Sequence, residues 1–211
     1  MRRGDCQQPR CSTGGWWRVT IVLADRPVME QRDTWRQQLQ GLLLVVVVAI
    51  ALRWGVVEPR WIPSESMQPG LQPQDRILVW KLGHRLGLSP NRNAVVVFRT
   101  PEVLAAAGYD PNAALIKRVV GVPGDAIAVE SGRLQRNGLP VSEPWIAEAM
   151  DYQLPPQTVE QGKLLVLGDN RNASLDSHLW GQLNEADVVG TARWRYWPLA
   201  DFGPIKAPAM G

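Results

Sequence analysis

The hydrophobic positions of the chain follow two patterns, an uninterrupted apolar run near residue 45 and short apolar segments after it. Residues 41–52 (GLLLVVVVAIAL) contain no polar side chain, and the wider stretch 39–57 adds Gln40 and Arg53 as interruptions. About 20 apolar residues cross a bilayer, and a core helix normally shows a polar face. We therefore predict a transmembrane helix that anchors the protein over residues 39–57.

Two other interpretations of this run stay open. Ala49, Ile50 and Ala51 form the A-x-A pattern of a cleavage site, which is typical of a signal peptide that is removed. A run of this length also occurs in buried core helices. Each alternative predicts a different location for the rest of the chain.

The arginines on either side of the run predict its orientation. Three of them precede it within about 15–20 residues and two follow it, which favours a cytoplasmic N-terminus and a main domain on the far side of the cell membrane. Met29 is an alternative start. If translation begins there, residues 1–28 are not made and the two flanks carry equal numbers of arginines.

From about residue 58 the apolar segments become short and β-branched, with Gly and Pro between them. The segments expected to be strands are 76–82, 94–98, 115–120, 125–130, 163–167 and 188–197. The sequence RLQRNG after residue 132 indicates a hairpin, and residues 101–114 and 140–162 are expected to be loops or excursions.

Many short strands punctuated by turn residues predict a mostly β fold, a barrel or sandwich of antiparallel sheets. The chain then divides into an N-terminal tail (1–38), the anchor (39–57) and a β domain (58–211).

Charge and composition argue against nucleic-acid binding and against a metal centre. The tail carries a net charge of +3 and the other 173 residues a net charge of zero, whereas nucleic-acid-binding domains concentrate positive charge on the folded part. The only cysteines, Cys6 and Cys11, lie in the tail, and His84 and His178 are the only histidines. We therefore expect no nucleic-acid partner, no cofactor and no metal centre in the β domain.

Two serines lie in a Pro-bounded segment soon after the apolar run. Ser64 and Ser66 occur in IPSESMQP, residues 62–69. Such a stretch often forms only a linker with a hydroxyl-stabilised turn. A serine hydroxyl becomes a useful nucleophile only with a base beside it.

Adjacent Lys117 and Arg118 occupy an apolar strand. Because side chains alternate along a strand, the two point to opposite faces, and one faces inward unless the strand lies at a sheet edge. Burial disfavours the charged form of lysine and lowers its pKa, which creates a general base near neutral pH.

A third segment, GDNRNASLDSH (168–178), follows an apolar strand and is rich in hydrogen-bonding side chains. It is typical of a surface loop, and it lacks the spacing of an EF-hand calcium site. Such a loop can also supply Ser174 to orient an amine and Asp176 to hold Arg118.

Four of these segments resemble, in the right order, the sequence boxes of bacterial type I signal peptidases. They are PSESMQP (63–69), DRILVWK (75–81), KRVVGVPGD (117–125) and GDNRNASLDS (168–177), and the similarity covers about residues 40–195. Members of that family are membrane-bound endopeptidases with a Ser/Lys dyad and a mostly β catalytic domain outside the cytoplasm. They remove signal peptides from exported preproteins by cutting after small residues at positions −1 and −3.

The resemblance implies a role for each matching residue. Ser66 would be the nucleophile, Lys117 the general base, Ser64 an oxyanion donor and Ser174 the residue that orients the lysine amine. Arg118 and Asp176 would pair as structural support. The implied walls of the substrate pockets are Ile62, Pro63, Met67, Leu71 and Ile116. The implied partners are preprotein signal peptides, membrane lipid and the nearby export translocon.

Rival interpretations differ in the base. A Ser-His-Asp hydrolase would use Ser66 and His178 with Asp169 or Asp176. A self-cleaving repressor-like protease shares the Ser/Lys chemistry, but the sequence shows no helix-turn-helix. A non-catalytic, membrane-tethered β module needs none of these residues. His178 also stands where many relatives carry Arg, which predicts a weaker and pH-sensitive contact with Asp176.

Overall fold

The computed structural model describes residues 29–205 of the 211-residue chain, apart from the side chains of residues 29–34 and 51–54. The predictions about residues 1–28 lie outside this part. The chain separates into two compact units, Met1–Val45 and Val46–Gly211, which are described one by one. The predicted boundaries after residues 38 and 57 stay predictions.

The apolar run is helical. Helix α1 (Met29–Gly55) contains it, and the large apolar side chains described between Leu39 and Ile50 are all well exposed. Among the described residues, no helical stretch has the length and apolar character that crossing a bilayer requires. The anchor over residues 39–57 therefore stays a prediction.

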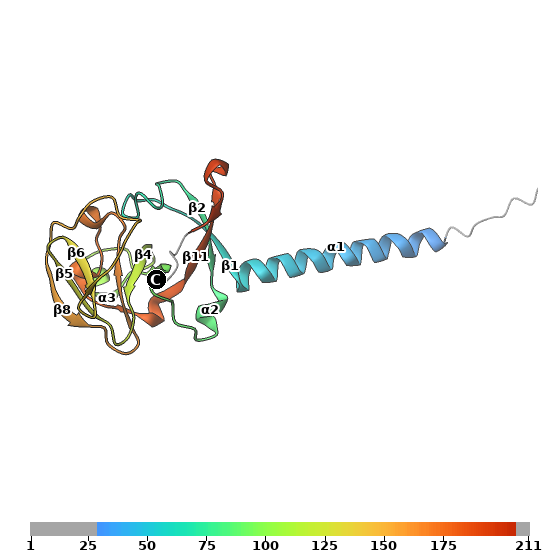
Figure 1. Ribbon diagram of the computed structural model, residues 1–211. Coiled ribbons are helices and arrows are strands. Elements are labelled where there is room, and N and C mark those ends of the chain that lie inside the picture. Colours follow the sequence, from blue (N-terminus) through green and yellow to red (C-terminus); the bar gives the residue numbers. More distant parts are fainter. Residues whose placement is uncertain (1–28, 206–211) are drawn as a thin grey trace, which may run out of the picture. The chain divides into compact units, whose positions relative to one another are not determined.

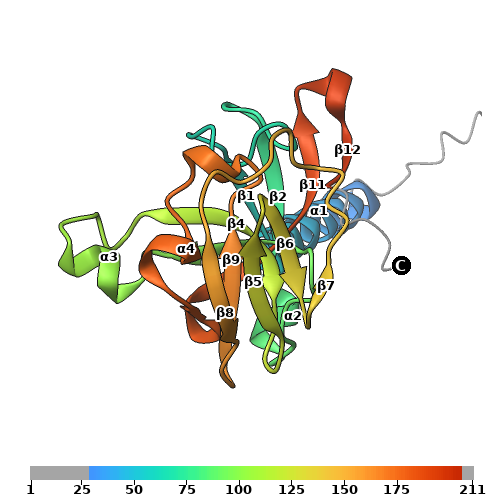
Figure 2. The ribbon, with the colours of Figure 1, turned by 60° about the vertical axis from the view of Figure 1, so that its left-hand side comes forward.

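Two antiparallel sheets form the unit Val46–Gly211 (Figures 1 and 2), which confirms the mostly β prediction. The larger sheet has the order β1-β2-β11-β3-β4-β9-β10, with β12 paired to β11; the smaller has the order β7-β6-β5-β8. The larger sheet consists of β1 (Val57–Trp61), β2 (Arg76–Trp80), β3 (Val95–Arg99), β4 (Ala114–Gly121), β9 (Lys163–Leu167), β10 (Leu183–Asn184), β11 (Val188–Trp197) and β12 (Gly203–Pro204). The smaller consists of β5 (Ala126–Glu130), β6 (Arg133–Arg136), β7 (Leu139–Pro140) and β8 (Leu154–Thr158).

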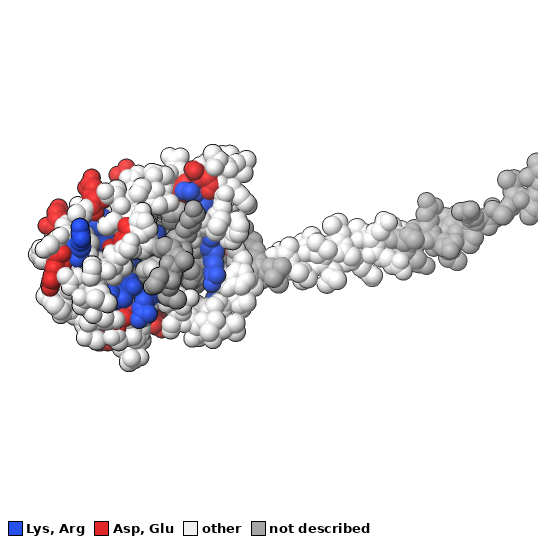
Figure 3. All heavy atoms as spheres, in the orientation of Figure 1, with Lys and Arg blue, Asp and Glu red and all other residues white. Residues whose placement is uncertain are grey.

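Short helices connect these strands. They are α2 (Leu82–Arg85), α3 (Glu102–Ala106), α4 (Ser177–Trp180) and the 3-10 turns η1 (Arg171–Ala173), η2 (Glu185–Asp187) and η3 (Leu199–Asp201). The predicted loop 101–114 thus includes α3 and joins the long strand β4. The acidic and basic side chains on the face of this unit drawn in Figure 3 are interspersed, in line with its near-neutral sequence.

The strand prediction missed β1 and β8, and β8 lies within the segment 140–162 that was expected to be a loop or an excursion. Both strands contain proline, Pro59 in β1 and Pro155 and Pro156 in β8. Each strand lies at the edge of its sheet. Proline is tolerated there because an edge strand needs no N–H donor on its outer side.

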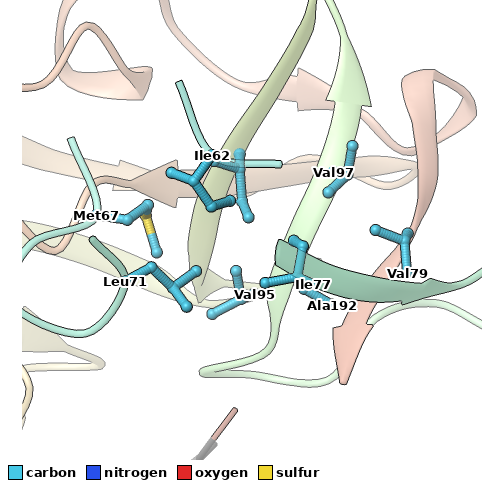
Figure 4. Packing of buried hydrophobic residues seen from close by; sticks show 9 residues of the cluster. Ile62, Met67, Leu71, Ile77, Val79, Val95, Val97 and Ala192 are labelled. Carbon is cyan, nitrogen blue, oxygen red and sulfur yellow. The ribbon is translucent and has the colours of Figure 1, made fainter. Parts of the chain in front are cut away.

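The core is built around β3, whose residues are buried on both faces. Val95 and Val97 belong to one cluster, which Figure 4 shows with Ile62, Met67 and Leu71. Val96 and Phe98 belong to a second cluster on the opposite face. A third cluster packs the smaller sheet against β4 and β9 (Figure 2). Full burial of such a side chain contributes about 1.5–3 kcal/mol, so β4, between these clusters, is firmly held.

Candidate active site

The structure brings Ser66 and Lys117 together. The Lys117 Nζ donates a hydrogen bond of 2.7 Å to the Ser66 Oγ. Ser66 lies in a turn after Pro63, and Lys117 lies in the middle of β4. Both residues are buried, with exposed fractions of 8% and 4%. The two candidates, 51 residues apart, thus share one water-poor site.

Lys117 is buried because β4 lies in the interior of its sheet. It pairs with β3 on one side and, from Arg118 onward, with β9 on the other. The alternative that the strand lies at an edge with both cations in water is therefore wrong. Burial lowers the pKa of Lys117 to about 8, although the negative charges of Asp176 and Asp169 act to raise it. A substantial fraction of the amine is then neutral at mildly alkaline pH.

Arg118, on the opposite face of β4, keeps its charge in an ion pair. Its Nε and Nη2 donate to the Asp169 carboxylate at 2.7 and 2.6 Å, and its Nη1 donates to the Asn93 carbonyl at 2.8 Å. The Trp145 ring lies 4.7 Å from the guanidinium carbon. This fork geometry is the strong form of a charge-assisted pair.

The predicted pairing of Arg118 with Asp176 is wrong. Leu167 of β9 lies opposite Arg118, so Asp169, two residues further on, emerges beside the guanidinium. Asp176 comes after another turn and accepts hydrogen bonds from Gly168 N at 2.8 Å and His178 N at 3.2 Å. It therefore fixes the shape of the loop after β9.

His178 is part of this loop support. Its Nδ1 lies 2.7 Å from Asp176 Oδ1, and its ring stacks on Tyr152 with a centroid distance of 4.1 Å. The hydroxyl of Ser66 is bonded by Lys117, and no contact between Ser66 and His178 occurs among the described residues. This arrangement disfavours the Ser-His-Asp alternative.

The two other serines differ in position. The Ser64 Oγ lies 3.3 Å from the Ser66 Oγ, and Ser64 is exposed. The Ser174 Oγ is buried and has no hydrogen-bond partner among the described residues, so the predicted contact with the Lys117 amine is not formed. Ser174 does lie beside the backbone of Ser66, because a Cβ on Gly168 would meet both the Ser174 Oγ and the Ser66 carbonyl oxygen at 2.5 Å or less.

The sequence analysis did not identify Gly168 or Trp145. It considered Asp169 only as a possible member of the alternative Ser-His-Asp triad. Gly168 allows the segments that carry Ser66 and Ser174 to approach more closely than any side chain permits. The sequence signal was its place directly after a buried strand. Nothing in the sequence connects Trp145, in the loop before β8, with Arg118.

A groove of about 740 Å³ runs beside the dyad. Three of the predicted pocket residues, Ile62, Pro63 and Ile116, line it. Met67 and Leu71 do not: their exposed fractions are 0% and 2%, and they pack in the core, so their prediction as pocket walls is wrong. The physical reason is that the turn after Ser66 folds inward and aims both side chains away from solvent.

The groove lies between two strand segments with unpaired edges. Residues 59–63 line one side and residues 113–116 the other. Among the described strands, β1 pairs with β2 alone, and the first half of β4 pairs with β3 alone until Arg118 meets β9. An extended peptide can therefore form backbone hydrogen bonds here next to Ser66.

No cluster of three or more His, Cys, Asp or Glu side chains suited to a metal ion occurs within the part of the chain that the structure describes. The chemistry derived below uses side chains alone.

Comparisons with known proteins agree with this geometry. The family model described as "Signal peptidase, peptidase S26" matches residues 35–197. Signal peptidase I of Leptolyngbya laminosa is 40% identical over 185 residues, 88% of this chain and 87% of that protein. Probable signal peptidase I-1 of Synechocystis sp. is 39% identical over 170 residues, 81% and 86% of the two chains. Thylakoidal processing peptidase 1 of Arabidopsis thaliana is 39% identical over 156 residues, 72% of this chain and 46% of that protein.

Proposed function

The chain belongs to the signal peptidase family, peptidase S26, and on that premise we propose that it removes signal peptides from exported preproteins with Ser66 as nucleophile and Lys117 as general base. Its activity is that of a serine peptidase of the signal peptidase I type. The observation that carries the proposed dyad is the 2.7 Å hydrogen bond between a buried amine, with a pKa of about 8, and a serine hydroxyl.

The proposed reaction has two halves. Neutral Lys117 takes the Ser66 proton as the Ser66 Oγ attacks the scissile carbonyl, and the resulting ammonium protonates the leaving amine as the C–N bond breaks. Water then loses a proton to Lys117 and attacks the acyl-enzyme carbonyl, and Lys117 returns this proton to the Ser66 Oγ as the ester C–O bond breaks, which restores Ser66 and the neutral amine. Ser–Lys pairs follow the same logic as the serine protease triad.

Ser64 is proposed to stabilise the oxyanion. Its Oγ, 3.3 Å from the Ser66 Oγ, is near the position where a substrate carbonyl oxygen would lie. The Ser66 backbone N–H is the proposed second donor. Donors already aimed at the developing charge lower the barrier because they need no reorganisation during the reaction.

The substrate is proposed to bind as an added strand in the groove between residues 59–63 and 113–116. The backbone hydrogen bonds of an added strand provide affinity, and shallow pockets select alternate side chains. Ile62, Pro63 and Ile116 are the proposed walls that exclude large residues at position −1. This limits cleavage to small residues there.

We further propose that the catalytic unit works against a lipid surface on the extracytoplasmic side of the cell membrane, near the export translocon. Trp61, Trp194 and Trp197 are 64%, 44% and 48% exposed. Trp61 and Trp197 lie in register on either side of Arg76, so they share one face of the larger sheet. Tryptophan and arginine favour the bilayer interface, which supports a lipid-facing role for this face.

A cleavage assay tests the dyad. Purified wild type, Ser66→Ala, Lys117→Met and His178→Ala are incubated with a preprotein. The proposal expects cleavage by the wild type and by His178→Ala, and none by the other two. If Lys117→Met cleaves while His178→Ala does not, the base is histidine and the Ser/Lys dyad is rejected.

A further inference from the structure

The backbone of Ser66 is held on both sides by one residue of the loop after β9, Asn170. The backbone N of Asn170 donates a hydrogen bond of 3.1 Å to the Ser66 carbonyl oxygen. Its side-chain Nδ2 donates a second bond, of 3.3 Å, to the carbonyl oxygen of Glu65, which lies 105 residues away in the chain. The two peptide groups that flank Ser66 therefore share a single donor residue.

The Glu65 carbonyl belongs to the same peptide group as the Ser66 N–H. A trans peptide group is planar, so its C=O and its N–H point in opposite directions. The hydrogen bond from Asn170 to this carbonyl therefore also fixes the direction of the Ser66 N–H. A hydrogen bond at the carbonyl end polarises the peptide group as well, which makes its N–H a stronger donor.

The two chain neighbours of Asn170 hold it in place, because each forms a buried ion pair. Asp169, before it, accepts the two hydrogen bonds from Arg118 at 2.7 and 2.6 Å. Arg171, after it, donates from Nη1 and Nη2 to the Glu143 carboxylate at 2.7 and 2.6 Å. Bidentate pairs of this kind are strong and geometrically specific. The Asn170 donors are therefore in position before any substrate binds.

We infer that Asn170 is a positioning residue whose side-chain amide aims the Ser66 N–H at the oxyanion that forms when Ser66 attacks the scissile carbonyl. This inference rests on the proposed function, in which the Ser66 N–H and the Ser64 hydroxyl are the two oxyanion donors. Such donors lower the barrier only as far as they are already aligned with the developing charge. The Asn170 amide bonds the enzyme's own backbone, so its loss misaligns a donor without removing it.

Aspartate distinguishes this role from simple packing of the Asn170 side chain. Asparagine and aspartate have nearly the same size, but an ionised aspartate carries acceptor oxygens only. Asn170→Asp would place a carboxylate oxygen against the Glu65 carbonyl oxygen, whereas Asn170→Ala would leave that carbonyl to water, because the site is only half-buried. A hydrogen-bonding role thus predicts that Asn170→Asp is less active than Asn170→Ala. A packing role predicts the reverse order.

The experiment measures kcat and KM for preprotein cleavage by the full-length wild type, Asn170→Ala and Asn170→Asp. The assay pH lies well above the Lys117 pKa of about 8, so that the base is neutral in all three proteins. For Asn170→Ala, kcat is expected to fall about ten-fold, less than the 10²–10³-fold that removal of an oxyanion donor causes. KM is expected to stay within about two-fold, since the lost alignment matters only in the transition state. Asn170→Asp is expected to have the lowest kcat.

Gln182→Ala is the matched control. The Gln182 Nε2 also donates a hydrogen bond to a backbone carbonyl, that of Thr158 at 3.0 Å, but in the connection between α4 and β10. This variant loses the same type of contact away from Ser66, so its kcat and KM are expected to equal those of the wild type. Urea unfolding of all the variants measures any accompanying loss of stability.

Four results would reject the role of Asn170 and leave the dyad unaffected. They are an Asn170→Asp variant more active than Asn170→Ala, an Asn170→Ala variant that changes KM alone, an Asn170→Ala variant that is unfolded, and a loss of kcat in Gln182→Ala as large as in Asn170→Ala. Failure of the proposed function looks different, because the wild type itself would then cleave no preprotein.

Discussion

The two faces of β4 treat their buried cations in opposite ways. Lys117 is hydrogen-bonded to a neutral hydroxyl, and within the described residues no carboxylate forms an ion pair with it. Arg118, the next residue, has a carboxylate, a carbonyl and an aromatic ring around its guanidinium. Burial alone therefore does not decide whether a cation has a structural or a catalytic role. The role depends on the group that lies next to the cation.

The chemical consequence follows from solvation. A buried ammonium without a compensating carboxylate gives up its proton, whereas a buried guanidinium with a bidentate carboxylate remains charged. One face can thus supply a base and the other a fixed support for the loop that carries Ser174. A substitution on the Lys117 face should therefore reduce activity, whereas a substitution on the Arg118 face should reduce stability.

The largest expected effect is the loss of activity in Lys117→Met. Because the substitution removes the base, cleavage should fall by about 10²–10⁴-fold. Folding at pH 7 should be unimpaired, since methionine fills a similar volume without a buried charge. Cleavage kinetics and urea unfolding measure the two properties. A variant that is inactive only because it is unfolded would contradict this view.

The opposite result is expected for the ion pair on the other face. Asp169→Ala leaves the Arg118 charge buried without its carboxylate and should lower the free energy of unfolding by about 3–5 kcal/mol. Urea unfolding measures this change. Asp201→Asn, at a 52% exposed carboxylate 3.9 Å from Arg195, is the control and should change it by less than about 1 kcal/mol. If the two substitutions lower the free energy of unfolding equally, the buried ion pair is no more important for stability than an exposed one. The structural role assigned to the Arg118 face would then be rejected.

The Ser64→Ala variant tests the proposed oxyanion donor. Loss of one oxyanion donor should reduce kcat by about 10²–10³-fold, which corresponds to about 3–4 kcal/mol. The pH dependence of the remaining activity should be unchanged, because the base is still present. Steady-state kinetics across pH 6–10 measure both quantities, and a shifted pH profile would show that Ser64 acts through Lys117 instead.

The pH profile of the wild type reports the Lys117 amine directly. Only neutral Lys117 can act as a base, so kcat/KM should rise about ten-fold per pH unit below pH 8 and level off above it. A profile that is already flat between pH 6 and 8 would mean that the base titrates elsewhere.

The smallest expected effect is on stability. Between pH 8 and 10.5 the unfolded chain binds a proton at Lys117 that the folded chain has lost, so the free energy of unfolding should rise with pH across this window. The difference between wild type and Lys117→Met should change by about 3 kcal/mol. Urea unfolding at several pH values tests this, and a constant difference would indicate a solvated amine.

Part of the fold followed from local pattern alone. A β-branched segment predicted β3 and a leucine-rich apolar segment predicted β9, and the turn residues Asn137 and Gly138, both at positive φ, predicted the end of β6. β1 and β8 escaped prediction because their prolines are acceptable only at a sheet edge. Whether a strand lies at an edge depends on segments far away in the chain.

The sequence by itself determined which chemical groups were present: one lysine and one arginine on alternate sides of a strand, two serines in a turn, and a loop of hydrogen-bonding residues. Only the tertiary structure decided that Lys117 meets Ser66, that Arg118 pairs with Asp169 rather than Asp176, and that Met67 and Leu71 pack inward. The physical reason is that hydration and partner choice depend on β3, β9 and the smaller sheet closing around β4. These contacts join segments that no local pattern relates.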